Sequence, residues 1–408
     1  MVGLSNIHKH LLAIFLISAI ATIIYSNSFD CTFHFDDQLA IVENYTIHRF
    51  DLKEIFYSSS RPILDITLAI NYYFGKLNVF GYHLVNLLLH ISNGIMLYFI
   101  LFQTANLSSL KEKYGQRAYR IALYASMVFI AHPIQTQAVT YIISRSSVLA
   151  TTFYLLTILL FIRAFQESSK LKAQSSKVES PKPETRNSKF KIQNSKFYLA
   201  GAFFSSCLGM GTKQIVATLP LMLLIYDFYF ISDGNWKILK GRYKVHLAMF
   251  STMAVTIYLS ASGLQKFVSF DYAKGVEMPF GEPVTSFQYF MTQLHVIPYY
   301  IRLLFIPTNL NLDYDWPITQ SIDFPTIMFF ILLVVIIVFA VWAYRRARLL
   351  SFGIIWFFVT LSVTSSFIVI YDVIFEHRLY LPSIGFALCI AIMISRISML
   401  KFGRTGQN

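Results

Sequence analysis

Residues 325–344 read PTIMFFILLVVIIVFAVWAY. No side chain in this stretch is charged, and a run of about twenty apolar residues is what an α-helix needs to cross the hydrocarbon core of a bilayer. Arg345, Arg346 and Arg348 follow at once, and clustered basic residues mark the cytoplasmic flank of a span. The stretch therefore predicts a membrane-spanning helix that ends in the cytoplasm.

The rest of the chain repeats this pattern. Of its 408 residues, 55% are hydrophobic and only 13% are charged, whereas a soluble domain is usually about 25% charged. We therefore predict one all-α integral membrane domain over residues 1–408, with about ten or eleven spans. The predicted spans are 11–27, 83–103, 118–131, 147–164, 197–211, 215–231, 245–262, 325–344, 349–370 and 381–397.

The first of these runs can also be read as a signal peptide. Its flank, Asn27-Ser28-Phe29, is a poor small-residue cleavage site, so we expect an uncleaved span.

The net charge of +13 follows the predicted topology. The segment 165–196 carries eight basic and three acidic residues and is rich in serine and lysine, which predicts a flexible basic cytoplasmic linker. Acidic residues outnumber basic ones in 28–82 and 263–324, which we place on the outer side. Because topology explains the charge, we expect no nucleic-acid partner. We expect a bacterial inner membrane with a periplasmic or external active face, or an ER membrane with a luminal one in a eukaryote.

Two outer segments have helical patterns without reading as ordinary spans. Residues 51–57 and 63–74 of the long first outer loop predict short interfacial helices. Residues 287–306 are long enough to span but are interrupted by polar residues and Pro298. A single crossing there would reverse the sidedness of the arginines at 345–348, so we expect an interfacial or re-entrant segment.

Two adjacent carboxylates, Asp36 and Asp37, stand just beyond the first span. Partial desolvation at a membrane edge raises a carboxyl pKa, and a neighbouring carboxylate raises it further. A general base that takes a proton from a hydroxyl needs this property. In extended backbone the two side chains would point to opposite faces, one toward the acceptor and one toward the scaffold. An ordinary solvated acidic turn is the alternative.

A further set of ionisable side chains shares the predicted outer membrane surface: Arg61, His83, His132, Arg145, Lys213, Glu376 and Arg378. Together with the carboxylate pair they predict a cavity with carboxylates on one side and cations for a phosphate on the other. Snorkelling of Arg145 and Lys213 to the interface is the alternative. Asp313 and Asp315 have a DxD spacing, but two carboxylates are too few to specify a divalent ion. The sequence thus allows a divalent metal without requiring any cofactor.

The order of several motifs along the chain carries a family resemblance. They are Phe35-Asp36-Asp37-Gln38, Ser60-Arg61-Pro62-Ile63, residues 81–90, His132-Pro133-Ile134-Gln135-Thr136, Ser144-Arg145, Lys213, residues 309–315 and Arg378-Leu379-Tyr380-Leu381-Pro382-Ser383. The ordered set resembles the membrane half of the transmembrane and tetratricopeptide-repeat O-mannosyltransferases and their prokaryotic relatives, in the GT-C glycosyltransferase superfamily.

The resemblance implies a GT-C-like helical bundle that transfers a sugar, mannose in that family, from a polyprenyl-phosphate donor to a protein or glycan acceptor, with inversion. By that analogy Asp36 is the base and Asp37 its partner, and the cationic set serves the donor phosphate. Gln137, Ser147 and Gln214 stand where the family has acidic residues. A transporter or flippase of lipid-linked glycans and an inactive membrane scaffold are the alternative functions.

Overall fold

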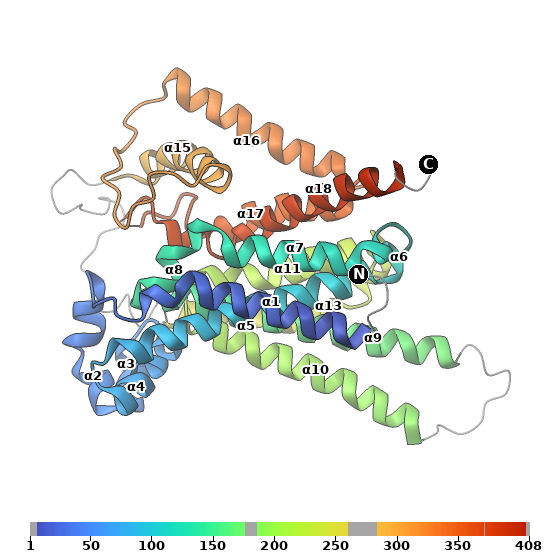
Figure 1. Ribbon diagram of the computed structural model, residues 1–408, viewed down its shortest axis with the longest axis horizontal. Coiled ribbons are helices and arrows are strands. Elements are labelled where there is room, and N and C mark those ends of the chain that lie inside the picture. Colours follow the sequence, from blue (N-terminus) through green and yellow to red (C-terminus); the bar gives the residue numbers. More distant parts are fainter. Residues whose placement is uncertain (1–5, 176–185, 260–283, 371, 405–408) are drawn as a thin grey trace.

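The computed structural model describes residues 6–175, 186–259, 284–370 and 372–404, and these parts are mostly helical (Figure 1). This confirms the predicted all-α membrane class. Helices or helical segments lie at all ten positions where spans are predicted: α1 (Asn6–Tyr25), α5 (Val79–Ala105), α7 (Ala118–Ala131), α9 (Arg145–Ser175), α10 (Arg186–Met210), α11 (Leu219–Tyr226), α13 (Tyr243–Ser251), α16 (Phe324–Ala343), α17 (Arg348–Leu361) and α18 (Ser383–Arg404).

Five helical segments in the described residues are long and apolar enough to cross a membrane. They are Ile7–Ser28, Val79–Ala105, Ile142–Ser168, Gln214–Ile231 and Phe324–Ala343. The last has a mean hydropathy of 3.1, and only 17% of its apolar window is buried inside the protein, as expected of a helix that faces lipid. The total of ten or eleven spans stays a prediction.

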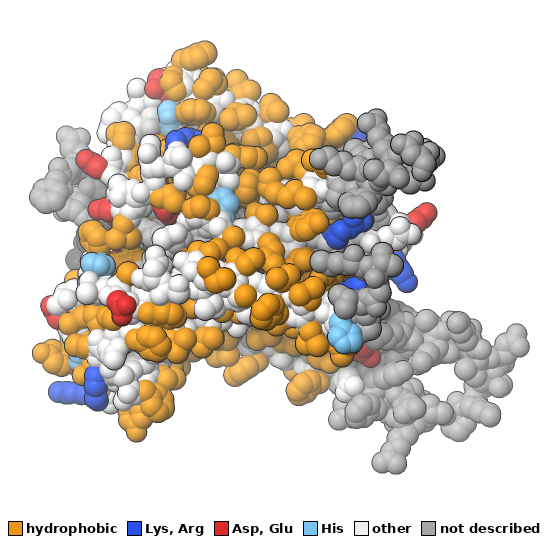
Figure 2. Space-filling view, in the orientation of Figure 1, with side chains coloured by type: hydrophobic (Ala, Val, Ile, Leu, Met, Phe, Trp, Pro, Cys, Tyr) orange, Lys and Arg blue, Asp and Glu red, His pale blue; other side chains and the backbone are white. Residues whose placement is uncertain are grey.

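The bundle helices run roughly side by side, and α1 begins at the same end of the molecule at which α18 ends (Figure 1). On the face drawn in Figure 2, hydrophobic side chains form a broad band between the two ends. Asp and Glu gather mainly toward the left end, around α2–α4 and α15. This distribution is that of a bundle with an apolar belt and two polar ends. The predicted linker 165–196 falls partly outside the described residues, in 176–185.

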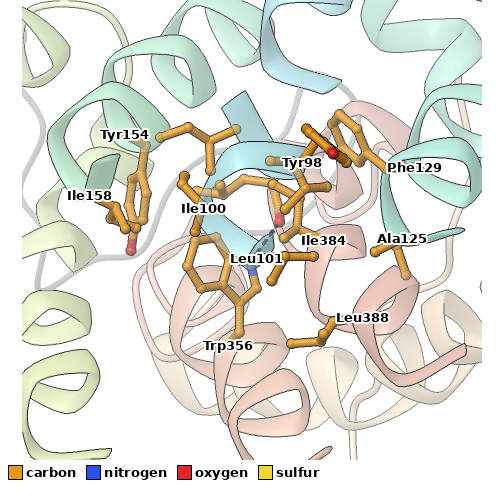
Figure 3. Packing of buried hydrophobic residues seen from close by; sticks show 14 of the residues in the cluster. Tyr98, Ile100, Leu101, Ala125, Phe129, Tyr154, Ile158, Trp356, Ile384 and Leu388 are labelled. Atoms are coloured by element: carbon orange, nitrogen blue, oxygen red, sulfur yellow. Dashed lines mark hydrogen bonds between the residues drawn. The ribbon is translucent and has the colours of Figure 1, made fainter. Parts of the chain in front are cut away.

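The core forms where α5, α7, α9, α17 and α18 meet (Figure 3). Trp356 of α17 packs edge-on against Tyr154 of α9 at 5.5 Å between ring centroids, and its indole N–H donates to the carbonyl of Leu381 at 2.9 Å. Gly353 and Gly385 allow α17 and α18 to cross closely, because a Cβ on Gly385 would lie 2.1 Å from the Gly353 carbonyl oxygen. Small residues at such crossings let membrane helices pack through their backbones.

Two bundle helices, α7 and α17, have 14 residues each. At a rise of about 1.5 Å per residue each is roughly 21 Å long, short of a hydrocarbon core of about 30 Å. Irregular backbone and short turns fill the remaining depth: η4 (Pro133–Gln135), α8 (Thr136–Thr140), η5 (Ile142–Ser144), residues 362–370 and 372–375, and η9 (Glu376–Leu379). The shortness of these helices therefore makes room for a polar site at one end of the bundle.

The segment predicted as the first outer loop, residues 28–82, contains α2 (Tyr45–Arg49), α3 (Leu52–Ser58) and α4 (Pro62–Gly75). Asn44 and Asp51 cap the first two through their side-chain oxygens, and Pro62 occupies the first turn of the third. Helices thus form at both positions predicted for interfacial helices. Phe56, Tyr73 and Phe74 are exposed there, as expected of helices that lie on a membrane surface.

Residues 287–305 fall within one 20-residue helix, α15 (Ser286–Phe305), which begins at a capping box formed by Thr285 and Gln288. Pro298 lies inside the helix, and the helix is not among the five segments that are both long and apolar enough to span. Whether it crosses the membrane stays a prediction. Other short helices in the described residues include α6 (Ser108–Tyr114) and α12 (Trp236–Lys240).

Candidate functional site

A cavity of about 910 Å³ lies where the predicted first outer loop, the start of α9, the turn before α11 and residues 363–370 and 372–378 meet. It brings together four of the predicted site residues: Asp36, Arg61, Lys213 and Arg378. Tyr141, Ser144, Ser146, Asp313, Asp372 and His377 also line it. A concave site with convergent ionisable groups is the usual form of a small-molecule site.

Asp36 is solvent-exposed and follows Phe35, whose φ of 46° places a non-glycine residue in the left-handed region. Such a conformation is costly, and it persists only where surrounding contacts hold it. One of these contacts is a hydrogen bond in which the Asp36 backbone N–H donates to the Tyr141 hydroxyl at 2.9 Å. The loop therefore holds the carboxylate at the cavity wall.

Asp37 lies on the other side of this loop and is only 1% exposed. Its two carboxylate oxygens accept hydrogen bonds from the backbone N–H groups of His34 at 3.1 Å and Ile143 at 2.8 Å. Burial raises the pKa of Asp37 from 3.8 to about 6, against the lowering effect of these two hydrogen bonds. The pair enters a helical turn instead of extended backbone, so that expectation was wrong, yet its side chains do reach different cavities.

The cations in the cavity lack carboxylate partners within ion-pair distance in the described residues. Lys213 is 9% exposed, and its ammonium donates to the Ser147 hydroxyl at 2.7 Å. Burial, and then the nearby charges of Arg61 and Arg378, hold the pKa of Lys213 well below its usual value. The buried Nε of Arg61 has no hydrogen-bond partner in the structure. An unpaired buried donor is costly, and an anion in the cavity would satisfy it.

Arg378 is anchored by its own loop. It donates to the carbonyl oxygens of Val373, at 3.1 Å, and Asp372, and it lies 5.7 Å from the centroid of the Phe375 ring. The neighbouring His377 also lines the cavity, and burial, followed by the charges of Lys213 and Arg378, keeps its pKa well below the usual value. Sequence reasoning missed His377 as a site residue, although its position beside Arg378 was a usable signal.

The cavity also has an apolar lining. Its apolar residues include Ile215, Ala217, Met253, Val363, Ile368 and Ile370. The site therefore combines cationic and apolar lining residues, which matches a ligand that carries an anionic headgroup on a hydrocarbon chain.

Arg145 does not line this cavity. It is fully buried beneath it, where its Nε donates to the Asn86 side-chain oxygen at 2.7 Å and its other nitrogens donate to the carbonyls of Thr67 and Tyr82 at 3.2 and 3.0 Å. The expectation that Arg145 and Arg378 face one cavity is therefore not met. The arrangement gives Arg145 a structural task, joining α4, α5 and α9.

Three further predicted residues, His83, His132 and Glu376, also lie outside the large cavity. His83 is buried, with its Nε2 at 2.9 Å from the Cys31 carbonyl. His132 accepts from the Ile134 N–H through Nδ1, so its Nε2 carries the proton and donates to the Leu304 carbonyl at 2.9 Å. Both rings thus fix the loops that frame the site. Their roles at a donor phosphate stay predictions.

Glu376 lies beside the site and organises a loop. It accepts from the Asn311 N–H at 2.6 Å and from the Tyr314 hydroxyl at 2.5 Å, and burial raises its pKa. It thereby holds the loop at 309–316 against η9.

Two of the three positions at which acidic residues were expected by resemblance, Gln137 and Ser147, make side-chain hydrogen bonds, and the third, Gln214, lines the large cavity. Gln137 donates to the Leu312 carbonyl at 2.7 Å and accepts from the His377 N–H at 2.6 Å, and Ser147 accepts from Lys213. Because Ser147 is neutral, the charge of Lys213 is left for a ligand. Among the described residues, no three His, Cys, Asp or Glu side chains are grouped so that they would hold a metal ion.

Fold and cavity together define an integral membrane protein, all-helical in its described part, with an amphipathic, cation-lined cavity at one end of its bundle. Sequence comparison confirms the family resemblance. The chain is 31% identical to the human protein O-mannosyl-transferase TMTC4 over 179 residues, which are 39% of this chain and 24% of that protein. It is 31% identical to human TMTC3 over 165 residues, 36% of this chain and 17% of that protein, and 30% identical to Drosophila melanogaster Tmtc3 over 191 residues, 41% and 21%.

The aligned region thus spans about a quarter of the human relative TMTC4, or less in the other two. No protein-family model matches the chain. No solved structure matches it either.

Proposed function

We propose that this protein is a glycosyltransferase that moves a sugar, mannose by analogy with its relatives, from a polyprenyl-phosphate donor to a protein or glycan acceptor on the outer side of the membrane. The observation that carries the proposal is the composition of the large cavity. Three carboxylates, of which Asp36 is the candidate base, share it with Arg61, Lys213 and Arg378, and aliphatic side chains line the same cavity.

The proposed chemistry follows from the residues that line this cavity. The acceptor hydroxyl attacks the anomeric carbon from the face opposite the phosphate, so the configuration inverts. A carbon–oxygen bond to the acceptor forms while the bond between the anomeric carbon and the phosphate oxygen breaks. Asp36 takes the hydroxyl proton, and the polyprenyl phosphate leaves with both bonding electrons. Arg61, Lys213 and Arg378 stabilise the negative charge that develops on it.

Donor binding tests the cationic half of the proposal. We expect Lys213→Met to weaken binding of a polyprenyl phosphate by about tenfold or more, because a charge-assisted contact to a desolvated phosphate is lost. Lys53→Met is the matched control, because Lys53 is exposed on α3 and does not line the cavity. Equal affinity in the Lys213 variant and the control would contradict the donor site.

Transfer itself is measured with the purified full chain in vesicles, a radiolabelled polyprenyl-phosphate mannose and a threonine-containing peptide. Labelled peptide is the expected product, with the anomeric configuration inverted relative to the donor. Retention of configuration would contradict the single-displacement mechanism, and release of free sugar without acceptor labelling would contradict the transferase assignment.

A further inference from the structure

A second cleft of about 300 Å³ adjoins the large cavity. The two spaces share two wall residues, Tyr141 and Leu312. The rest of the second cleft is lined by Cys31, Thr32, His34, Asp37, Thr136, Gln137, Thr140, Leu310, Asn311 and Glu376. The Tyr141 side chain that accepts a hydrogen bond from the Asp36 backbone is therefore also part of the wall between the two spaces.

The two spaces differ in charge. The large cavity is lined by Arg61, Lys213 and Arg378 together with three aspartates, whereas the described residues that line the second cleft include two carboxylates and neither lysine nor arginine. The carboxylates of the second cleft, Asp37 and Glu376, are buried and accept hydrogen bonds from backbone N–H groups. An anionic headgroup is therefore favoured in the large cavity and disfavoured in the second cleft.

We propose that the second cleft is the acceptor subsite, that it binds an extended, neutral or basic polypeptide segment, and that Tyr141 is a positioning residue which holds Asp36 between acceptor and donor. This inference rests on the proposed function. The segment presents a serine or threonine hydroxyl past Tyr141 to Asp36, and the proton of that hydroxyl passes to Asp36 as its oxygen bonds to the anomeric carbon.

The chemistry of the lining favours a polypeptide. Hydroxyls of Thr32, Thr136 and Thr140 and the amide of Asn311 line the cleft beside Leu310 and Leu312. Such mixed hydroxyl, amide and aliphatic groups suit a backbone with short side chains. Among the described lining residues, Tyr141 is the one Phe, Tyr or Trp side chain, so the cleft offers little of the aromatic surface on which sugar rings stack.

An exposed cysteine provides a direct probe. Cys31 lines the second cleft and is a free, exposed thiol, whereas Cys207 lies on α10 and is half-buried. The full chain in vesicles is treated with N-ethylmaleimide, and modification of each cysteine is quantified by peptide mass spectrometry. With a threonine-containing neutral peptide at about ten times its Kd, modification of Cys31 should slow about tenfold, because occupancy then exceeds about 90%. Modification of Cys207 should not change.

Two further ligands, polyprenyl phosphate and a phosphorylated peptide, test which of the two cavities binds the peptide. Polyprenyl phosphate alone should leave modification of Cys31 unchanged, and protection by it would overturn the assignment. Phosphorylation of the peptide should abolish protection. Failure of threonine peptides to protect Cys31 at any concentration up to saturation of transfer would also overturn the subsite. Protection without any sugar transfer would instead leave the subsite standing and contradict the proposed function.

Tryptophan substitutions, one in each cavity, test whether peptide and donor bind in separate spaces. Thr136→Trp should weaken peptide protection and raise the peptide KM about tenfold, with polyprenyl-phosphate affinity unchanged, because Thr136 is exposed and lines the second cleft alone. Ala217→Trp, at a residue that lines the large cavity and not the second cleft, should do the reverse. Tyr141→Phe should lower kcat more than it changes either affinity. Similar effects of the two Trp variants on both ligands would overturn the division.

Discussion

The adjacent carboxylates Asp36 and Asp37 perform different physical tasks. Asp36 is exposed at the cavity that holds the cations, whereas Asp37 is buried and accepts two backbone N–H groups. Although the two residues are adjacent in sequence, Asp36 is therefore placed for chemistry and Asp37 anchors the loop.

The first prediction concerns Asp36. Asp36→Asn should lower the transfer rate about 10²-fold or more with donor affinity nearly unchanged, because general-base catalysis contributes roughly 10² to 10⁴. Asp30→Asn, an exposed carboxylate of the same loop that lines neither cavity, is the control and should keep its activity. Rates like those of the wild type in the Asp36 variant would remove the base assignment.

The second prediction concerns pH and Asp37. Its pKa is about 6 in the folded protein and near 3.8 in an unfolded chain, so the folded state binds its proton more tightly. This group therefore contributes stability below about pH 4, and the contribution is lost as the pH rises through about 6. Melting temperatures between these pH values should fall in the wild type and fall less in Asp37→Asn. Identical slopes for the two proteins would contradict the shift.

The sequence predicted the location of a site residue correctly where its charge and its place in the topology were enough to locate it. Asp36, Arg61, Lys213 and Arg378 were expected at the outer surface, and they meet in one cavity. Arg145 was expected beside them, but its acceptors Asn86, Thr67 and Tyr82 come from two other helices, and no local pattern signals such a convergence. Tyr141 was missed because a tyrosine at a membrane interface is ordinary in sequence.

At the scale of elements, the helices at the predicted spans could be predicted because a long apolar run indicates a membrane-spanning helix. The short turns between the bundle helices could not be predicted from the sequence. Whether backbone after α7 continues as a helix or breaks into η4, α8 and η5 depends on tertiary partners such as the Leu304 carbonyl bound by His132. Those partners lie far away in sequence.

The third prediction concerns the crossing of α17 and α18. Gly385→Ala should lower thermal stability by about 1–3 kcal/mol, the usual cost of overpacking, because its Cβ would overlap the Gly353 carbonyl. Gly75→Ala at the end of α4 meets nothing within 4 Å and is the matched control. Thermal unfolding in detergent measures both. A Gly385 variant as stable as the control would mean that the helices separate freely.

For the whole molecule, the basic loops and the cavity are predicted to lie on opposite sides of the membrane. This is the fourth prediction. In a Cys31→Ser background, cysteines at Lys240, on α12, and at the exposed Asp315 should react with impermeant reagents from opposite sides, with Lys240→Cys labelled only from the cytoplasm. Labelling of both from one side would contradict the topology.

The short helices α7 and α17 have a consequence for the surrounding lipid. Each is roughly 9 Å shorter than a typical hydrocarbon core, and a helix that is too short for the core is accommodated by local thinning of the bilayer. This hydrophobic mismatch is greatest in thick membranes. We therefore expect the transfer rate to be higher in vesicles of short-chain than of long-chain phosphatidylcholine at equal donor density, with a smaller change in donor affinity. The protein would then be suited to thin membranes by the length of two helices.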